Sequence, residues 1–562
     1  MLLSGSMGAL AQEAPAPENK TLPTVTVKEK AEPEEGRDSL RATRTGIARG
    51  TQELRDIPQS VTVVTEKLMD DRNLDTLKEV LQYTAGISFL AAEGGEEDIR
   101  LRGYSLQSTG DIFVDVLRDP GFYDRDTFNF DRVEIIRGSA SMLFGRGSTG
   151  GAVNQVSKVP RLMDENRIDF TVGNHNFLRF TGDFNAHVGE SAALRVNVMG
   201  NTASNDGAGN SIRKDGIAGA YRWGIGERDE FTAALFYLDN RNGINYGLPW
   251  IRPAANSPAS DATVLPLDPS NYYGMASDFN KGSAGYGTFS WQRRLDDGGL
   301  IKSQVRYGNY ERDQRASTIR LCQGTTNPNT GVYTPNANCP TTVNANLSNF
   351  GPASVLTRGT QLKIQNLQTV YAQSDYINTF NWGGLRHEVL AGVDYALEKK
   401  QVYAQLSAAQ GGYNPAKPNT TAGTPDDGAW INESARVLRL ASEYKAQGIG
   451  VYAQDLVQVA PAWKVLGGLR YDYLAGDYDS FNIPANAASP TTTSSYRMRV
   501  SEWSWRLGAL YQPNPLDSYY ASAATSFNTS GDAYSLSAAN QNIPPEQSAN
   551  LEIGAKLDSA DK

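Results

Sequence analysis

The sequence lacks an apolar run of about 18 or more residues, the length that a helix needs to cross a bilayer. Cysteine and histidine are scarce, with two Cys and three His in 562 residues. His175, His187 and His387 lie too far apart for metal-ligand spacing. A net charge of -9 gives no basic surface for nucleic acid. These absences argue against a helical membrane protein, a zinc module and a nucleic-acid-binding protein.

The chain is long and contains many tyrosine and glycine residues. A chain of 562 residues exceeds one ordinary core, so we expect at least two domains. The 27 Tyr and 54 Gly fit either a large soluble β-protein or an outer-membrane barrel. Carboxylates are plentiful, but no pair lies in a context that suggests acid–base catalysis. We therefore expect a protein that is not an enzyme.

The first residues are typical of the end of a secretory signal. Residues 1–11 are small and apolar, and Ala9-Leu10-Ala11 fits a cleavage site. A frayed apolar N-terminus is the alternative. Export would place Cys322 and Cys339 in an oxidising compartment, which favours a local disulfide within an exposed loop. A lone Cys pair without nearby His does not complete a zinc site.

Two segments precede the long C-terminal region. Residues 12–45 are rich in Pro, Glu and Lys and predict a flexible tether, with a β-prone patch at residues 22–27 suited to strand addition. Residues 46–160 predict a compact α/β domain of about a hundred residues. Within it, apolar spacing predicts one helix over residues 65–83.

Residues 161–562 alternate between apolar and polar side chains. Examples are residues 301–307 and 463–473, in which one face is apolar and the other carries Arg, Lys, Asp or Asn. A soluble sandwich also alternates, but charged inward positions on nearly every strand do not suit a dry core. They suit a polar or plugged lumen with the apolar face toward lipid. The sequence therefore predicts a transmembrane antiparallel β-barrel, incomplete as given, with an N-terminal α/β plug domain inside the lumen.

Loop lengths support a membrane barrel, because short turns at residues 296–299 and 381–384 contrast with long connections. The long connections are expected at residues 239–280, 311–366, 399–445 and 474–498. The region would hold roughly fifteen or sixteen strands without a sign of closure. Since lipid does not tolerate unpaired edges, we expect a partial barrel whose C-terminal strands are missing.

A glycine-rich run, Gly145-Arg146-Gly147-Ser148-Thr149-Gly150, matches the dinucleotide-binding pattern G-x-G-x-x-G. Strand-like sequence follows it instead of a helix, and no βαβ unit surrounds it. The glycines are better explained by tight turns.

Several blocks within residues 56–154 carry a family resemblance. They resemble the plug of TonB-dependent siderophore receptors, in that family's order and spacing. The blocks are Asp56-Ile57-Pro58-Gln59-Ser60-Val61-Thr62-Val63-Val64, Tyr83-Thr84-Ala85-Gly86-Ile87, Leu101-Arg102-Gly103-Tyr104, Arg132-Val133-Glu134-Ile135-Ile136-Arg137-Gly138 and Leu143-Phe144-Gly145-Arg146-Gly147-Ser148-Thr149-Gly150-Gly151-Ala152-Val153-Asn154. Downstream, residues 545–554 resemble a barrel strand of the same family. Within the family, residues 91–100 and 118–128 are most similar to the Fiu-type catecholate receptors.

The resemblance implies active import of a ferric siderophore, a catecholate by subfamily, across the cell outer membrane. The implied partners are the ferric siderophore, TonB with its inner-membrane energising complex, and outer-membrane lipid, without nucleic acid. No cofactor is expected, because iron arrives as a siderophore chelate. The resemblance makes residues 12–45 a periplasmic segment, and the implied TonB box within it is Leu22, Pro23, Thr24, Val25, Thr26 and Val27. The implied plug–barrel lock is Arg102 and Arg137 with Glu552.

A ferric tris-catecholate is anionic and aromatic, so arginines and aromatic rings match it. Our candidate ligand residues are Phe89, Glu93, Arg118, Phe122, Tyr123 and Arg125. The alternative is that Phe122 and Phe128 are plug core and that the arginines pair with Asp119, Asp124 and Asp126. Weaker candidates in the loops are Tyr246, Trp250, Tyr272, Tyr273 and Trp430.

Other functions remain open at this point. A receptor of the same family for a hydroxamate siderophore, cobalamin or an oligosaccharide is one alternative. A passive porin is a weaker one, because it needs neither a plug nor a strand-forming box. An exported enzyme or a soluble adhesin is also conceivable, and extraction behaviour would separate it, since a barrel requires detergent.

Overall fold

The computed structural model describes residues 37–559 except 51, 91–97, 107–109, 122, 205–208, 255, 323, 327–329, 331–332, 335–338, 340–344, 486–490 and 530–534. The predicted signal remnant and TonB box lie outside these residues, and so do Glu93 and Phe122. In the part of the chain that is described, no helix is long and apolar enough to cross a membrane.

The N-terminal domain is a small α/β unit with a five-stranded sheet in the order β1-β7-β8-β5-β6. Its elements are η1 (Leu54–Asp56), β1 (Val61–Thr65), α1 (Glu66–Asp71), α2 (Leu77–Leu81), β2 (Ile87–Leu90), β3 (Asp98–Leu101), β4 (Tyr104–Ser105), β5 (Ile112–Val114), β6 (Leu117–Arg118), β7 (Phe130–Arg137), α4 (Ser141–Phe144) and β8 (Gly151–Ser157). Strands β5 and β8 are parallel, and the other pairs in this sheet are antiparallel. Leu77, Leu81 and Val133 are fully buried in the core between the helices and the sheet.

The single helix predicted over residues 65–83 is wrong, because the chain forms two short helices. Helix α1 ends before Asn73, whose φ of 49° is left-handed, a conformation that Asn tolerates better than most residues. Thr76 and Glu79 then form a reciprocal capping box that starts α2. Apolar periodicity continues across the break, which explains why the pattern looked like one helix.

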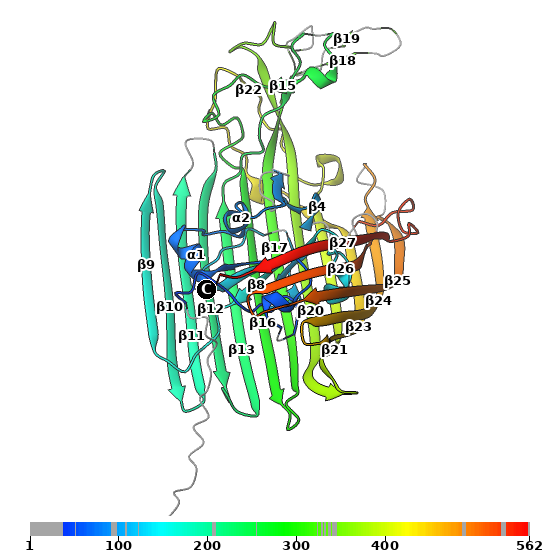
Figure 1. Ribbon diagram of the computed structural model, residues 1–562. Helices are drawn as coiled ribbons and strands as arrows, with labels where there is room; N and C mark the ends of the chain where they lie inside the picture. The colour runs from blue at the N-terminus through cyan, green and yellow to red at the C-terminus, as the bar shows by residue number, and fades with distance from the viewer. Residues whose placement is uncertain are drawn as a thin grey trace, which may run out of the picture.

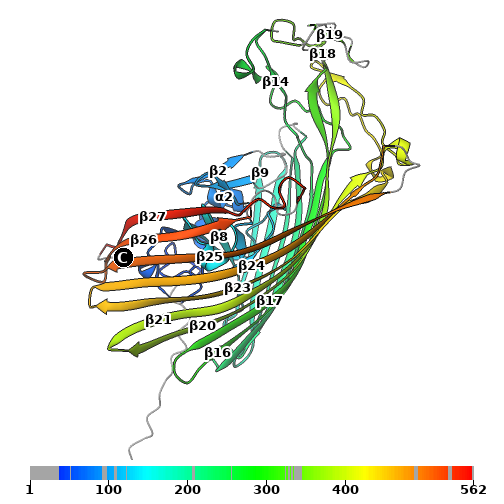
Figure 2. The same cartoon turned by 90° about the vertical axis from the view of Figure 1, so that its right-hand side faces the viewer.

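The rest of the chain forms one large antiparallel sheet of fifteen strands, β22 (Thr420–Thr421) included. The other fourteen follow one another in space in chain order and curve around the N-terminal domain (Figures 1 and 2). They are β9 (Glu165–Gly173), β10 (Phe177–Gly189), β11 (Ala192–Ser204), β12 (Ser211–Trp223), β13 (Asp229–Asn242), β16 (Phe279–Arg294), β17 (Leu300–Leu321), β20 (Val355–Trp382), β21 (Leu385–Gln405), β23 (Leu438–Ala460), β24 (Trp463–Asn482), β25 (Thr492–Tyr511), β26 (Asp517–Asn528) and β27 (Glu546–Leu557).

Strands β9 and β27 are the two ends of this sheet, and no described residues pair them with each other. The predicted plug and barrel architecture is thus confirmed, while the expectation of further strands beyond residue 562 stays a prediction.

The two faces of the sheet have opposite chemistry. Large apolar side chains such as Phe170, Leu235 and Trp503 are exposed on the outer face. Charged side chains such as Arg306 and Arg470 are buried on the inner face. The alternation read from the sequence is therefore an apolar wall around a polar interior that the plug fills.

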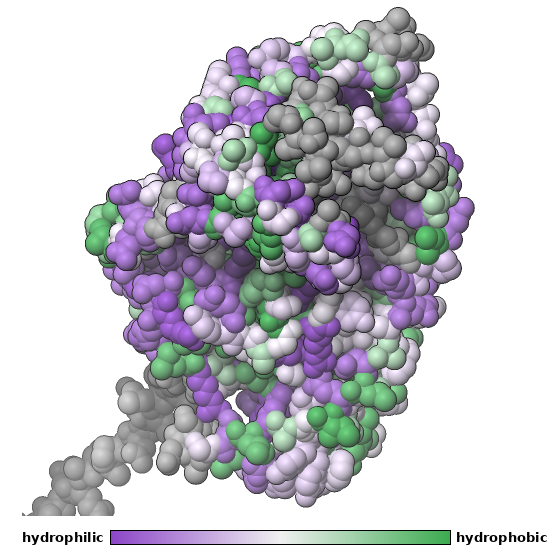
Figure 3. All heavy atoms as spheres, turned by 90° about the horizontal axis from the view of Figure 1, so that it is seen from above, coloured by the Kyte–Doolittle hydropathy of each residue, from purple (hydrophilic) through white to green (hydrophobic). Residues whose placement is uncertain are grey.

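The long connections gather at one end of the barrel (Figure 1). They contain β14 (Trp250–Ile251), η2 (Ala259–Asp261), β15 (Thr263–Val264), β18 (Thr325–Thr326), β19 (Tyr333–Thr334), η3 (Ala408–Gln410), η4 (Glu433–Ala435) and β22. Seen from this end, hydrophilic residues predominate, with smaller apolar patches between them (Figure 3). All four predicted loop ranges were too wide. The range 239–280 overlaps only the ends of β13 and β16, whereas the other three overlap more, because β17, β20, β21, β23, β24 and β25 extend beyond the wall into the loop region.

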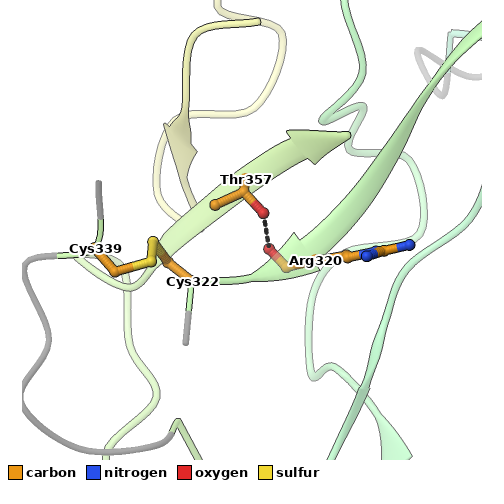
Figure 4. The surroundings of a disulfide bond; sticks show 4 residues. All are labelled: Arg320, Cys322, Cys339 and Thr357. Atoms are coloured by element: carbon orange, nitrogen blue, oxygen red, sulfur yellow. Dashed lines mark hydrogen bonds between the residues drawn. A yellow bond between two sulfur atoms is a disulfide. The ribbon is translucent and has the colours of Figure 1, made fainter. Parts of the chain in front are cut away.

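A disulfide joins Cys322 to Cys339 in the connection between β17 and β20, with the two Cα atoms 5.4 Å apart (Figure 4). Beside it, the Thr357 hydroxyl donates to the Arg320 carbonyl at 3.3 Å. Beneath the loops, Ile251, Leu265 and Tyr273 pack against strand residues in a separate apolar cluster. The loops are therefore held to one another and to the strand extensions.

Candidate functional site

A cavity of about 90 Å³ lies between the plug and the barrel wall, near the middle of β20, β21, β23 and β24. On the plug side it is lined by residues from β5, β6, α4 and the turn that follows α4. Its charged lining residues are Arg49, Arg118, Arg146, Arg470, Asp394, Glu398 and Asp472. Its aromatic lining residues are Phe113, Phe144, Tyr371, Tyr395, Tyr473 and Phe527. The cavity therefore combines cationic and aromatic groups, with four arginines against three carboxylates.

Backbone carbonyls position Arg118. Its guanidinium donates to the Arg146 carbonyl at 2.7 Å and to the Phe144 carbonyl at 3.3 Å, and it also contacts the Gly110 carbonyl. The Asp111 carboxylate lies 3.9 Å away. Burial lowers the pKa of Arg118 most, because it disfavours the charged guanidinium. The positive charge of the neighbouring Arg146 lowers it further by repulsion.

The turn after α4 brings Arg146 to the barrel wall. Gly145 and Gly147 have φ values of 75° and 85°, which glycine adopts without strain, and strand β8 follows. The glycine-rich run therefore forms a turn before a strand, as predicted. Arg146 donates to both oxygens of Glu398 on β21, at 2.6 and 2.8 Å.

Ion pairs between plug and wall also occur away from this cavity. Arg179 on β10 makes a bidentate contact with Asp126 of the plug, at 2.8 Å for both bonds. The side chains of this pair are 6% and 0% exposed, so water screens them little. Arg306 on β17 contacts Asp115 of the plug at 3.1 Å. Lys214 on β12 contacts Asp124 at 2.7 Å. The inner face of the barrel is thus matched to plug carboxylates along several strands.

The predicted lock residues are only partly brought together. Arg102 lies 3.7 Å from Glu552 on β27, and the Arg102 side chain is 38% exposed. Glu552 also accepts hydrogen bonds from the Ser60 backbone N–H and the Tyr520 hydroxyl, both at 2.7 Å. Arg137 instead donates to the Ala85 carbonyl and to hydroxyls of the plug. A single 3.7 Å contact to a partly exposed arginine contributes less than a buried bidentate pair, so the stronger contacts lie elsewhere.

Two of the predicted ligand residues, Tyr123 and Arg125, are buried, and Tyr123 packs against the barrel wall, so neither side chain is exposed to a ligand in this structure. Arg125 is 1% exposed and donates to Asp119 at 2.6 Å. The Tyr123 hydroxyl donates to the same carboxylate at 2.8 Å, and burial followed by the charge of Asp119 raises the pKa of Tyr123 well above its ordinary value. The Tyr310 hydroxyl of β17 completes this cluster at 3.0 Å from Asp119. The alternative, in which the arginine pairs with a neighbouring aspartate, is correct for Arg125.

The remaining candidates have mixed positions. Phe89 packs against the plug core, and Arg118 lines the cavity. Tyr272 and Tyr273 are buried inside the loops, whereas Trp250 and Trp430 are 68% and 62% exposed. Tyr246 is half-buried. Of the proposed residues that the structure describes, only Arg118 lies at the cavity described above.

Sequence reasoning missed Arg146, Glu398 and Arg470 as site residues. Arg146 lies in the glycine-rich run, which was interpreted only as a turn. Glu398 is 252 positions away along the chain. Inward-facing charge was the available signal, but it did not indicate which plug segment faces each strand.

Comparison with known proteins agrees with this architecture. The TonB-dependent receptor plug domain matches residues 53–152, and the TonB-dependent receptor-like β-barrel matches residues 221–562. The probable TonB-dependent receptor BfrD of Bordetella pertussis is 27% identical over 532 residues, covering 91% of this chain and 67% of BfrD. The catecholate siderophore receptor Fiu of Escherichia coli K12 is 25% identical over 550 residues, covering 90% of this chain and 67% of Fiu.

Solved structures share the fold. The siderophore receptor PiuA from Acinetobacter baumannii superposes with a TM-score of 0.79 at 24% identity, covering 93% of this chain and 73% of PiuA. The closed form of Fiu from E. coli K12 gives a TM-score of 0.80 at 23% identity, covering 93% of this chain and 74% of Fiu.

We expect Arg179→Gln to loosen the plug much more than Arg102→Gln. The first change leaves the buried Asp126 without its bidentate partner, at a cost of about 3–5 kcal/mol. The second removes a half-exposed pair, which contributes about 1 kcal/mol or less. Hydrogen–deuterium exchange of the plug amides, with the receptor in detergent, measures both. Equal exchange in the two variants, or faster exchange in Arg102→Gln, would contradict the ranking.

Proposed function

Because this chain belongs to the TonB-dependent receptor family, whose plug and barrel lie in the outer membrane, we propose that it imports a ferric siderophore by energy-coupled transport. We further propose that the siderophore is a catecholate. The observation that carries this proposal is the cavity in which Arg118 and Arg146 lie beside aromatic rings.

The chemistry of that cavity fits an anionic aromatic ligand. The positive charges of Arg118 and Arg146 repel one another, while Asp111 and Glu398 attract the Arg118 guanidinium. An anion placed between the two guanidiniums would relieve this repulsion. Catecholate rings also stack on Phe and Tyr faces and on guanidinium planes. Phe113 and Phe144 of the plug supply such faces.

The cavity is smaller than a whole siderophore complex needs. Ligand pockets usually measure about 300–1,000 Å³, against about 90 Å³ here. We therefore expect the complex to contact the cavity from the loop side and to widen it. Widening would act directly on the Arg146–Glu398 pair, so ligand binding and plug movement would be coupled.

Energy coupling would begin at residues 22–27, outside the described residues. A β-prone segment on a flexible tether can add a strand to the sheet of a partner protein, which here is TonB with its inner-membrane energising complex. Iron is cargo in this scheme and reaches the protein already chelated. Among the described residues, no group of three or more His, Cys, Asp or Glu is arranged to hold a metal ion.

The names of the relatives support a siderophore as the ligand, but they do not agree on its chemical class, which an uptake experiment can determine. Fiu is a catecholate siderophore receptor, and PiuA of A. baumannii is a probable TonB-dependent siderophore receptor, 27% identical over 585 residues. The ferrichrome outer membrane transporter of E. coli K12 is 24% identical over 595 residues, so a hydroxamate is the rival ligand.

Uptake of radiolabelled iron tests the ligand class and the coupling together. Iron-starved cells with this protein as their only siderophore receptor would receive ferric catecholates or ferric hydroxamates. We expect catecholate uptake in the parent and none in Val25→Pro, because proline removes a backbone donor from the added strand. Uptake of hydroxamate alone would overturn the catecholate assignment. Uptake that is unchanged in Val25→Pro would overturn the energy-coupled mechanism.

Arg118→Gln tests the cavity itself. Loss of a charged hydrogen-bond donor costs about 1.5–3 kcal/mol, so binding of the ferric catecholate should weaken about ten- to a hundredfold. Binding is measured by quenching of intrinsic fluorescence in purified receptor. Arg228→Gln, in the turn between β12 and β13 and 52% exposed, is the matched control and should bind like the parent. Parent-like binding by Arg118→Gln would place the ligand elsewhere.

A further inference from the structure

The outer, membrane-facing wall of the barrel carries a groove of about 350 Å³ across β16, β17, β20 and β21. Its lining residues are Phe289, Trp291, Ser303, Gln304, Val305, Ala372, Gln373, Ser374, Val393, Asp394 and Tyr395. The apolar members Phe289, Val305 and Val393 are 44%, 42% and 41% exposed. The groove therefore opens on the apolar outer face. It lies across the barrel wall from the arginine cavity, and the two share the wall residues Ala372, Gln373, Asp394 and Tyr395.

Small residues make its floor. Register places Ser303 beside Ser374, and Ala372 beside Val305. Trp291 flanks Ser303 on one side, and Val393 flanks Ser374 on the other. The hydroxyls of Ser303 and Ser374 hydrogen-bond to each other at 2.8 Å. In this pair one hydroxyl donates and the other accepts, which reduces the polarity that the floor presents, so the floor suits an apolar occupant.

The groove runs from the short-turn rim toward the middle of the wall. Trp291 is three residues before the end of β16 at Arg294, next to the short turn. Val393 is eight residues after the start of β21 at Leu385. Short turns mark the periplasmic side of such barrels. An occupant would therefore enter near the periplasmic interface and extend into the hydrocarbon region.

A cation lies at the rim end of the groove. Arg293 occupies the next outer-face position below Trp291, and its side chain is 39% exposed. Arg293 lies 3.6 Å from Asp229, which also accepts a hydrogen bond from the Trp291 indole at 3.0 Å. A guanidinium has five N–H donors, so this long contact leaves donors for a phosphate. The Trp291 ring is fixed as a wall beside them.

We propose that this groove binds one phospholipid of the periplasmic leaflet, with its phosphate at Arg293 and one acyl chain over Ser303, Ala372 and Ser374. The surroundings of the wall are hydrocarbon, and an unfilled groove there loses dispersion contacts along its whole length. Arg293 lies at the interface end of the groove, where the phosphate of a lipid would lie, and the apolar floor extends toward the hydrocarbon region, where its acyl chain would lie. This proposal rests on the fold and not on the transported ligand.

Native mass spectrometry of the purified receptor with added palmitoyl-oleoyl phosphatidylglycerol tests it. We expect one retained phospholipid in the parent and at least about fivefold less in Ala372→Phe, whose ring fills the floor. Arg293→Gln should lower retention about fivefold, the change that corresponds to one lost cation–lipid contact, and Arg293→Lys should restore most of it. Heat-modified gel mobility verifies that each variant is folded.

Ala509→Phe is the matched control, because Ala509 lies on the same outer face at β25, beside Val465, and outside the groove. It should retain lipid like the parent. Equal retention in Ala372→Phe and Ala509→Phe would mean non-specific lipid and would overturn the proposal. Parent-like retention by Arg293→Gln would overturn the phospholipid assignment. If a crosslinker attached at residue 374 joins two copies of the receptor, the groove is an interface between copies and the phospholipid proposal is overturned.

Discussion

The pairing of inward-facing barrel charges with the plug is the interaction on which the rest of this structure depends. A charge removed from water without a partner is costly, and the inner wall carries charges on most of its strands. Arg179, Lys214 and Arg306 each contact a plug carboxylate. The plug carboxylates thus neutralise the inward-facing cations of the barrel, and the barrel wall in turn replaces water around the charged surface of the plug.

This constraint gives the arginine cavity its significance. The pair formed by Arg146 and Glu398 joins plug and wall, while Arg118 beside it is held mainly by carbonyls. An anionic ligand would compete for the same cations that hold the plug. Recognition and release of the plug would therefore use one set of charges, and no separate signalling element is needed between the ligand and the first moving contact.

Much of the fold follows from local pattern. Period-two alternation predicted the wall, its apolar outer face and its charged inner face, because successive side chains of a strand point to opposite faces of the sheet. The plug was predicted from its motif blocks. The break between α1 and α2 was missed, because the apolar spacing of Leu74 and Leu77 continues through it while the Asn73 turn and the Thr76 cap interrupt the backbone.

The site was predicted less well, for a physical reason. Which plug loop meets which strand depends on the docking of two domains, and Arg146 and Glu398 are 252 positions apart. Arginine is a residue type expected to contact an anionic ligand, yet the Arg125 guanidinium is buried and donates to Asp119, six positions earlier. Local sequence shows that a charge needs a partner, and only the assembled fold shows which partner it has.

A double-mutant cycle on Arg146→Gln and Glu398→Gln tests the central claim most directly. Exchange of the Gly147 amide, which donates to the Phe527 carbonyl of β26 at 2.8 Å, reports plug opening at this place. The account predicts a coupling energy of about 1.5 kcal/mol or more between the two changes, as expected for a close, buried charge pair. Additive effects, with a coupling below about 0.5 kcal/mol, would contradict it, because the plug would then be held by shape and not by charge.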